Sequence, residues 1–221
     1  MSSKVALLAG ASGLVGKELL TFLLNEPSYS KVIVLVRRPL AILHPKLVQY
    51  EVDFSTTGFE NDKVKNLSID QAFCTLGTTI KCAGTRAAFR QVDQQFVVNV
   101  AQMAKDNGAE LFCVVTAMAA NSDSMIFYNR VKGDVEKELQ QLNFKFLASF
   151  RPSMLVGDRL EQRFAEKLGT VFLTVFDFLI PKNYKVIAVK KVALAMLGYA
   201  KDPVIGFSII PSKVMNNRLN D

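Results

Sequence analysis

The chain has 221 residues, of which 50% are hydrophobic and 21% are charged, and this composition excludes a disordered protein. Lys and Arg (27) outnumber Asp and Glu (20), but they are scattered from Lys4 to Arg218, so the net charge of +7 does not indicate a nucleic-acid-binding face. The single histidine and the absence of CxxC spacing argue against a metal site, and the three cysteines indicate reduced thiols in a cytosol.

The chain begins with an apolar run at residues 5–9, a glycine-rich turn and a helical pattern at residues 17–24. This strand–turn–helix order is the context that a dinucleotide-binding turn requires. Its glycines would allow backbone N–H groups to approach a pyrophosphate at the helix N-terminus. The predicted phosphate-binding residues are Gly10, Ala11, Ser12, Gly13, Leu14, Val15 and Gly16.

A second β-branched run, residues 31–36, ends at Arg37 and Arg38. A site that prefers NAD usually has an acidic residue at this point, which bonds the ribose hydroxyls of adenosine. Two guanidinium groups suit the 2′-phosphate of NADP(H) instead, so we expect NADP(H) rather than NAD(H). The alternative is an exposed basic turn before Pro39.

The remainder of the chain continues to alternate between strand and helix, which predicts an α/β fold with a doubly wound parallel sheet. Strands are expected at residues 47–52, 71–76, 111–116, 146–150 and, at an edge, 206–210. Helices are expected at residues 83–108, with an interruption by loop residues near the start, from Tyr128 to about 142, and at 187–199. We expect one domain, residues 1–221, with a short C-terminal substrate lid at about 157–185.

No secretory signal precedes the first strand, and the longest apolar stretch, residues 171–180, is too short to span a bilayer and contains Asp177. We therefore expect a cytoplasmic protein with no membrane segment.

The most informative pair is Tyr128 and Lys132, which lie one turn apart on the same face of a predicted helix. An ammonium group beside a phenol stabilises the phenolate, so the tyrosine can act as an acid or base near neutral pH. Alone, such a pair is usually an exposed helical contact. Together with the glycine turn, it predicts a nicotinamide-dependent reductase.

Several stretches resemble the atypical short-chain dehydrogenases/reductases, and in particular the subgroup of Tat-interacting-protein-like oxidoreductases. The resemblance follows the chain in order through GASGLVG at 10–16, VRR at 36–38, CTLGTT at 74–79, RQVD at 90–93, YNRVKGDVE at 128–136 and FRPSMLVGDRLEQR at 150–163. It implies a Rossmann-type fold and a nucleotide-binding domain with a short lid.

The resemblance also implies roles for single residues. Asp53 would contact the adenine amino group, and Leu76 and Gly77 would line the adenosine ribose. Leu155 would contact the nicotinamide end, and Arg163 would reach the cofactor from the lid.

For catalysis, the resemblance implies that Tyr128 donates a proton to a carbonyl oxygen and that Lys132 bonds the nicotinamide ribose. Thr116 stands at the position of the serine that orients the carbonyl, and Ala117 has no donor to replace it. The alternative for Thr116 is a strand-end residue that satisfies local groups.

Two functions from different classes remain open. The first is an NADP(H)-dependent oxidoreductase that reduces a small carbonyl compound. The second is a regulatory protein that senses NADP(H) and binds a protein partner with little turnover. Retention of both Tyr128 and Lys132 favours the enzyme. Either a monomer or a homodimer paired through the helices at 83–108 and 128–142 would fit.

Overall fold

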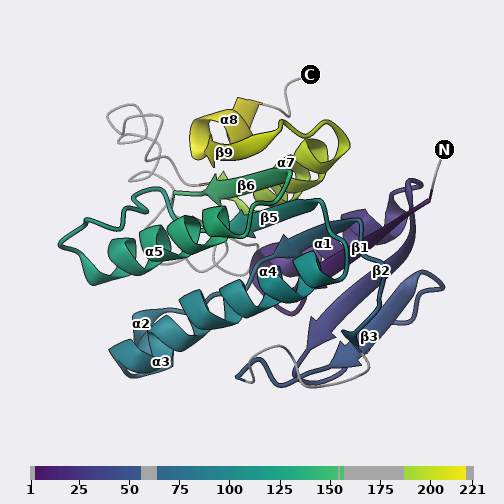
Figure 1. The fold of residues 1–221 in the computed structure, drawn as a ribbon, viewed down its shortest axis with the longest axis horizontal. Helices are drawn as coiled ribbons and strands as arrows, with labels where there is room; N and C mark the ends of the chain where they lie inside the picture. Colours follow the sequence, from purple (N-terminus) through teal and green to yellow (C-terminus); the bar gives the residue numbers. More distant parts are fainter. Residues whose placement is uncertain (1–2, 56–63, 154, 157–186, 218–221) are drawn as a thin grey trace, which may run out of the picture.

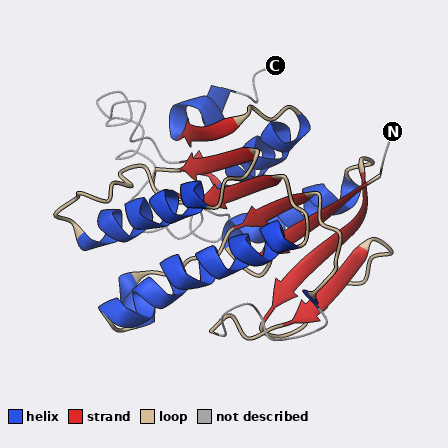
Figure 2. Cartoon of the chain, in the orientation of Figure 1, coloured by secondary structure: helices blue, strands red, loops and turns tan. Residues whose placement is uncertain are grey.

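The computed structural model describes residues 3–55, 64–153, 155–156 and 187–217. Within them, seven strands form one parallel sheet in the order β3-β2-β1-β4-β5-β6-β9, with helices on both faces (Figures 1 and 2). This is the predicted Rossmann-type α/β fold. The strands are β1 (Lys4–Ala9), β2 (Tyr29–Val36), β3 (Leu47–Glu51), β4 (Gln71–Cys74), β5 (Leu111–Val115), β6 (Phe146–Arg151) and β9 (Gly206–Pro211).

The central strands are apolar on both faces because helices cover both faces of a parallel sheet. In β1, alternate residues enter different cores: Ala6 and Leu8 face one layer, whereas Leu7 and Ala9 face the other. β9 pairs in parallel with β6, with Leu147 opposite Phe207. The edge strand expected at residues 206–210 is therefore confirmed.

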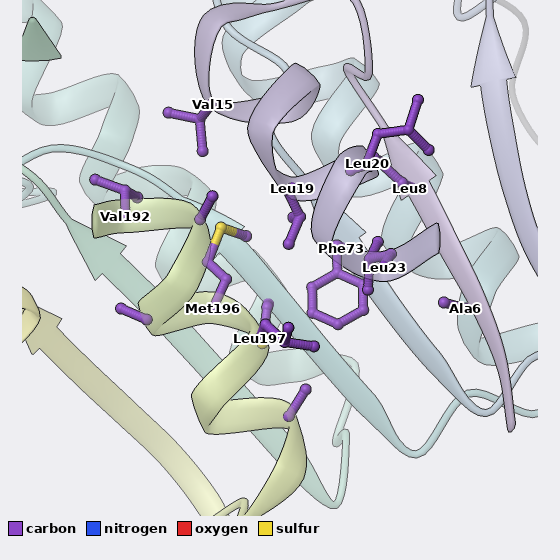
Figure 3. Packing of buried hydrophobic residues seen from close by; sticks show 14 of the residues in the cluster. Ala6, Leu8, Val15, Leu19, Leu20, Leu23, Phe73, Val192, Met196 and Leu197 are labelled. Carbon is purple, nitrogen blue, oxygen red and sulfur yellow. The ribbon is translucent and has the colours of Figure 1, made fainter. Parts of the chain in front are cut away.

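Helices α1 (Leu14–Asn25) and α7 (Val189–Lys201) cover one face of the sheet, and their contact is visible in Figure 3. Leu19 and Leu23 of α1 point toward Met196 and Leu197 of α7, over Phe73 of β4 (Figure 3). Apolar residues spaced by three or four positions give each helix a buried stripe that fits this packing.

Helices α4 (Phe96–Asp106) and α5 (Phe127–Gln141) lie side by side on the opposite face (Figure 1). Val97 and Val100 of α4 and Val135 and Leu139 of α5 are buried in the second core cluster. The last helix is α8 (Ser212–Asn217), which follows β9.

Two local features differ from the sequence expectation. The helix expected at residues 83–108 has its expected interruption, at Gly84 and Thr85 between α2 (Ile80–Ala83) and α3 (Arg86–Arg90), but it also contains a π-helical turn η2 (Gln91–Gln95) before α4. Two short strands, β7 (Leu155–Val156) and β8 (Ile187–Ala188), pair outside the main sheet. The lid expected at residues 157–185 lies outside the described residues.

The α1–α7 contact yields a stability prediction. Leu19 has no exposed surface, whereas Leu14 of the same helix is 51% exposed. Leu19→Ala should therefore lower the free energy of unfolding by about 2–5 kcal/mol, because it leaves a cavity in the core. Leu14→Ala, the matched control, should change it by less than about 0.5 kcal/mol. Urea unfolding of both variants measures the difference, and equal losses would contradict the packing described above.

Candidate functional site

The strand order reverses between β1 and β4, the two central neighbours in the sheet. In open parallel sheets, ligands bind beyond the carboxyl ends of the strands at such a switch point. A cavity of about 960 Å³ lies there, large enough for an organic ligand of cofactor size. It is lined by the turn after β1, by the segment after β2 and by the loop after β4.

The turn after β1 owes its shape to contacts that only glycine permits. Gly10 has a φ of +90°, and a Cβ atom there would lie 2.6 Å from Thr75 Oγ1. A Cβ on Gly16 would lie 2.1 Å from the carbonyl oxygen of Gly10. Thr75 also closes the turn, because its Oγ1 donates to the carbonyl oxygens of Ala9 and Gly10 at 3.1 and 3.2 Å. Gly10 and Gly16 are thus required by the fold.

Gly13 is different. It is the N-cap of α1, and a Cβ there would meet only the carbonyl oxygen of Gly10, at 3.3 Å. No side chain caps this helix and no acidic residue lies in its first turn. Its first backbone N–H groups and its positive dipole end therefore suit an anion. Gly10, Ala11, Ser12 and Gly13 line the cavity, so this part of the predicted phosphate site faces it.

Arg37 and Arg38 follow β2 and line the same cavity. Both are exposed, and the parallel register of β1 and β2 brings them to the same end of the sheet as the glycine turn. Leu76 and Gly77, after β4, line the cavity as well. The geometry therefore brings together a helix N-terminus, two guanidinium groups and an open backbone segment.

Lys132 lies behind the Gly77 segment and is 4% exposed. Its Nζ is 2.7 Å from Oδ1 of Asp93, which is 1% exposed. The other carboxylate oxygen of Asp93 accepts a hydrogen bond from Thr78 N at 2.8 Å. A Cβ on Gly77 would lie 3.3 Å from Asp93 Oδ1 and 3.8 Å from Lys132 Nζ. The ion pair therefore lies directly against the cavity wall.

Tyr128 lies one turn before Lys132 on α5 and is half-buried. Its ring centroid is 5.6 Å from that of Phe89 in α3, which is fully buried. Gly133 fixes the neighbouring loop, since a Cβ there would be 2.1 Å from the backbone nitrogen of Ser122. These contacts orient the start of α5, where an acid/base residue has been predicted.

Thr116 requires a correction. Its hydroxyl donates to Glu136 Oε1 at 2.8 Å and lies 2.7 Å from Ser149 Oγ, all three residues being buried. Arg151 completes this network through Nε, which donates to Glu136 Oε1 at 2.9 Å, and through a second guanidinium contact. The Thr116 hydroxyl thus bonds a buried carboxylate and is not presented to a substrate. This agrees with the alternative role, a strand-end residue that satisfies groups of the protein itself.

Other predicted residues lie elsewhere. Val15 is buried in the core and Leu14 is exposed on α1, so neither lines the cavity. Asp53 is exposed, and its bonds from the side chain and backbone of Ser55 hold the pKa of its carboxyl below the usual value. Its neighbour Phe54 lines the cavity instead. Leu155 is half-buried and packs against the core. Arg163 lies outside the described residues.

Asp93, the last residue of the RQVD stretch at 90–93, was not predicted to belong to the site. One signal was present: an acidic residue interrupts the apolar stripe formed by Phe89, Phe96, Val97 and Val100. Thr78 and Phe96 line the cavity, and neither was predicted as a site residue.

The cysteines have different surroundings. Burial raises the pKa of the Cys74 thiol to about 12 and raises that of Cys113 well above its usual value, so both remain protonated at neutral pH. Cys82 is exposed and lines the cavity. In the part of the chain that the structure describes, no cluster of His, Cys, Asp or Glu side chains could hold a metal ion. No helix among these residues is long and apolar enough to cross a membrane.

Comparison with known proteins identifies the relatives of this chain. The protein HTATIP2 of Rattus norvegicus is 34% identical over 180 residues, which cover 78% of this chain and 71% of the rat protein. The chain belongs to the HTATIP2 family. The mitochondrial protein FMP52 of Coccidioides immitis is 31% identical over 169 residues, or 72% of this chain and 69% of that protein. No protein-family model matches the sequence.

Solved structures agree on the fold. An oxidoreductase of the short-chain dehydrogenase/reductase family from Burkholderia thailandensis has a TM-score of 0.71 and 16% identity, covering 100% of this chain and 96% of its own. MoeE5 in complex with UDP-glucose and NAD has a TM-score of 0.65 and 14% identity, covering 92% of this chain and 74% of its own. The resemblance to the Tat-interacting-protein-like subgroup is confirmed by the HTATIP2 relative, and the expected Rossmann-type fold is confirmed by these structures.

The expected cytoplasmic location is wrong. FMP52 relatives from several fungi, including Candida albicans and Saccharomyces cerevisiae, are named as mitochondrial proteins. The names of these relatives point to mitochondria rather than to the cytoplasm.

The two kinds of glycine in the turn give a test of the site. Gly16→Ala should destabilise the protein by more than about 2 kcal/mol, because its methyl group would overlap the Gly10 carbonyl and force the backbone to move. Gly13→Ala should change stability by less than about 1 kcal/mol, since its methyl group meets a single atom at 3.3 Å. Thermal and urea unfolding measure both. If Gly13→Ala lowered the free energy of unfolding as much as Gly16→Ala, Gly13 would be required by the fold and not by the approach of a ligand.

Proposed function

We propose that this protein is an NADP(H)-dependent oxidoreductase that reduces a small carbonyl compound. The observation that carries the proposal is the cavity at the β1–β4 switch point, which is lined by Gly13, the N-cap of α1, and by Arg37 and Arg38. MoeE5, which has a similar fold and was solved in complex with NAD, supports a nicotinamide dinucleotide as the cofactor. The residues fit such a cofactor because the open Gly13 leaves room for a pyrophosphate.

The two arginines account for the choice of NADP(H). The Gly13 N–H donates to the Gly10 carbonyl oxygen at 2.9 Å, so the pyrophosphate would be held by the first backbone N–H groups of α1. Arg37 and Arg38 would then bond the 2′-phosphate of the adenosine ribose, a doubly charged group for which guanidinium is well suited. Leu76 and Gly77 would line the path toward Lys132, whose Nζ would bond the nicotinamide ribose.

For the chemical step, the bound nicotinamide would supply a hydride to the carbonyl carbon. Tyr128 would donate its phenolic proton to the carbonyl oxygen, and Lys132 would stabilise the resulting phenolate through its positive charge. The ring contact with Phe89 limits the positions open to the phenol. Tyr128 and Lys132 thus perform acid catalysis, and Thr116 supports the helix from beneath.

One observation favours the second candidate, a regulatory protein that binds NADP(H) with little turnover. The Thr116 hydroxyl is occupied by Glu136 and Ser149, and Ala117 carries no donor. The two positions that follow β5 therefore offer no free side-chain hydroxyl to orient a carbonyl. Such a protein would keep the cofactor cavity and use the bound state to change its affinity for a protein partner.

Cofactor preference is tested by calorimetry with NADPH and NADH. NADPH should bind at least about tenfold more tightly, since a charge-assisted bond to the 2′-phosphate contributes about 1.5–3 kcal/mol. Arg37→Ala should remove most of this preference and leave NADH binding unchanged. Lys31→Ala, an exposed basic residue at the other end of β2, is the control. Equal affinities for the two cofactors in the wild type would contradict the assignment of the arginines.

Catalysis is tested by following NADPH absorbance with a panel of aldehydes and ketones. Tyr128→Phe should lower kcat by about 10²–10⁴-fold, the usual contribution of general acid catalysis, while NADPH affinity is retained. Tyr50→Phe, a change of the same kind on β3, serves as the control. If the wild type binds NADPH but its slow turnover is unaffected by Tyr128→Phe, the regulatory candidate replaces the enzyme.

A further inference from the structure

Asp93 is a buried charge in the middle of a helical segment, a position that acidic residues rarely occupy without a partner. It is the central residue of the π-helical turn η2, between the exposed Gln91 and Gln95. A π-turn adds a residue to the helix and turns a side chain to a new direction, and such turns recur at functional sites. Here the turn directs a carboxylate inward at the cavity wall.

Each oxygen of the carboxylate has a partner on a different element. Oδ2 accepts from Thr78 N in the loop after β4, and Oδ1 lies 2.7 Å from Lys132 Nζ on α5. Asp93 therefore connects the loop that lines the cavity to the helix that carries Tyr128. The absence of a side chain at Gly77 leaves space for this contact, since a Cβ there would be 3.3 Å from Oδ1.

Lys132 needs such a partner for two physical reasons. A buried ammonium group without a counter-charge is strongly unfavourable. A lysine side chain also has four rotatable bonds, so a single acceptor on a fixed element decides where Nζ lies. The contact with Asp93 is an ion pair with 2.7 Å between Nζ and Oδ1, and an ammonium group has three N–H donors, so it can also bond a ligand.

We propose that Asp93 is a positioning residue that holds Lys132 Nζ against the Gly77–Thr78 loop, where it can bond the nicotinamide ribose. This inference rests on the proposed function, because the ribose is part of the proposed cofactor. In this role η2 fixes the position of Lys132, so loss of Asp93 should weaken binding of the nicotinamide half of the cofactor. An ion pair that only stabilised the fold would not affect the binding of one half of the ligand more than the other.

The test uses two probes that share the adenosine half. NADP⁺ contains the nicotinamide ribose, whereas adenosine 2′,5′-bisphosphate lacks it and ends at the adenosine phosphates. Calorimetry measures both with the wild type, with Asp93→Asn and with Asp134→Asn. Asp134 is the matched control, because it pairs with Arg90 at 3.0 Å across the same helices but is partly exposed.

Asp93→Asn should weaken NADP⁺ binding by about tenfold or more, the loss expected when a charged hydrogen-bonding partner is removed. Its affinity for adenosine 2′,5′-bisphosphate should stay within about twofold of the wild type, and Asp134→Asn should bind both probes normally. Equal weakening of both probes, or of neither, would overturn the inference. A wild type that binds neither probe would instead overturn the proposed cofactor, and the inference with it.

If Asp93→Asn does not fold, Asp93→Glu carries the test with the same probes. It keeps the negative charge beside Lys132 but moves the carboxylate outward by one methylene, so Nζ must shift. A selective loss of NADP⁺ affinity is expected. Unchanged NADP⁺ binding by a folded Asp93→Glu variant, or an equal loss for both probes, would overturn the positioning role.

Discussion

Two ion pairs hold helix α5, and the proposed chemistry depends on them. The helix contributes the cation to the first pair, which is buried, and the anion to the second, which is partly buried. Lys132 pairs with Asp93 of η2, and one turn later Glu136 pairs with Arg151 of β6. Breaking a buried pair by removing one partner costs about 3–5 kcal/mol, because the remaining charge is left in a medium that solvates it poorly. Since the pairs reach different neighbours, α5 can neither rotate nor slide without losing one of them. Tyr128, one turn before Lys132, is thereby fixed in direction.

The other half of the site is built from the backbone. Gly10 and Gly16 let β1, the turn and α1 pack closely, whereas a Cβ atom on Gly13 would meet one atom, the Gly10 carbonyl oxygen at 3.3 Å. The same short turn thus serves both packing and ligand approach. It lies at the β1–β4 switch point, where the cavity is lined by Arg37 and Arg38 on one side and by Gly77, beside the Lys132–Asp93 pair, on another. A parallel sheet brings these segments together because each follows the carboxyl end of a strand.

The strands and the strand–turn–helix at the start of the chain follow from local rules and could be predicted from sequence, whereas the roles assigned to single site residues stay predictions. The apolar strands, the glycine turn, the two arginines and the four-residue spacing of Tyr128 and Lys132 each depend on a short stretch of chain. The parts that failed depend on packing between distant segments. The direction of the Thr116 hydroxyl is decided by Glu136 and Ser149, and the pairing of Leu155 with Ile187 joins residues far apart in sequence. The burial of Asp93 depends on the π-helical turn η2 and on its contact with Lys132, which is 39 residues later in the chain.

The most direct test of this account is a crystal structure of the protein with NADP⁺ bound. We expect the pyrophosphate over Gly13 at the start of α1, the 2′-phosphate within hydrogen-bonding distance of Arg37 or Arg38, and the nicotinamide ribose bonded to Lys132 Nζ while Asp93 keeps its contact with that group. A dinucleotide bound away from the β1–β4 switch point, or bound there with its nicotinamide ribose remote from Lys132, would contradict the account.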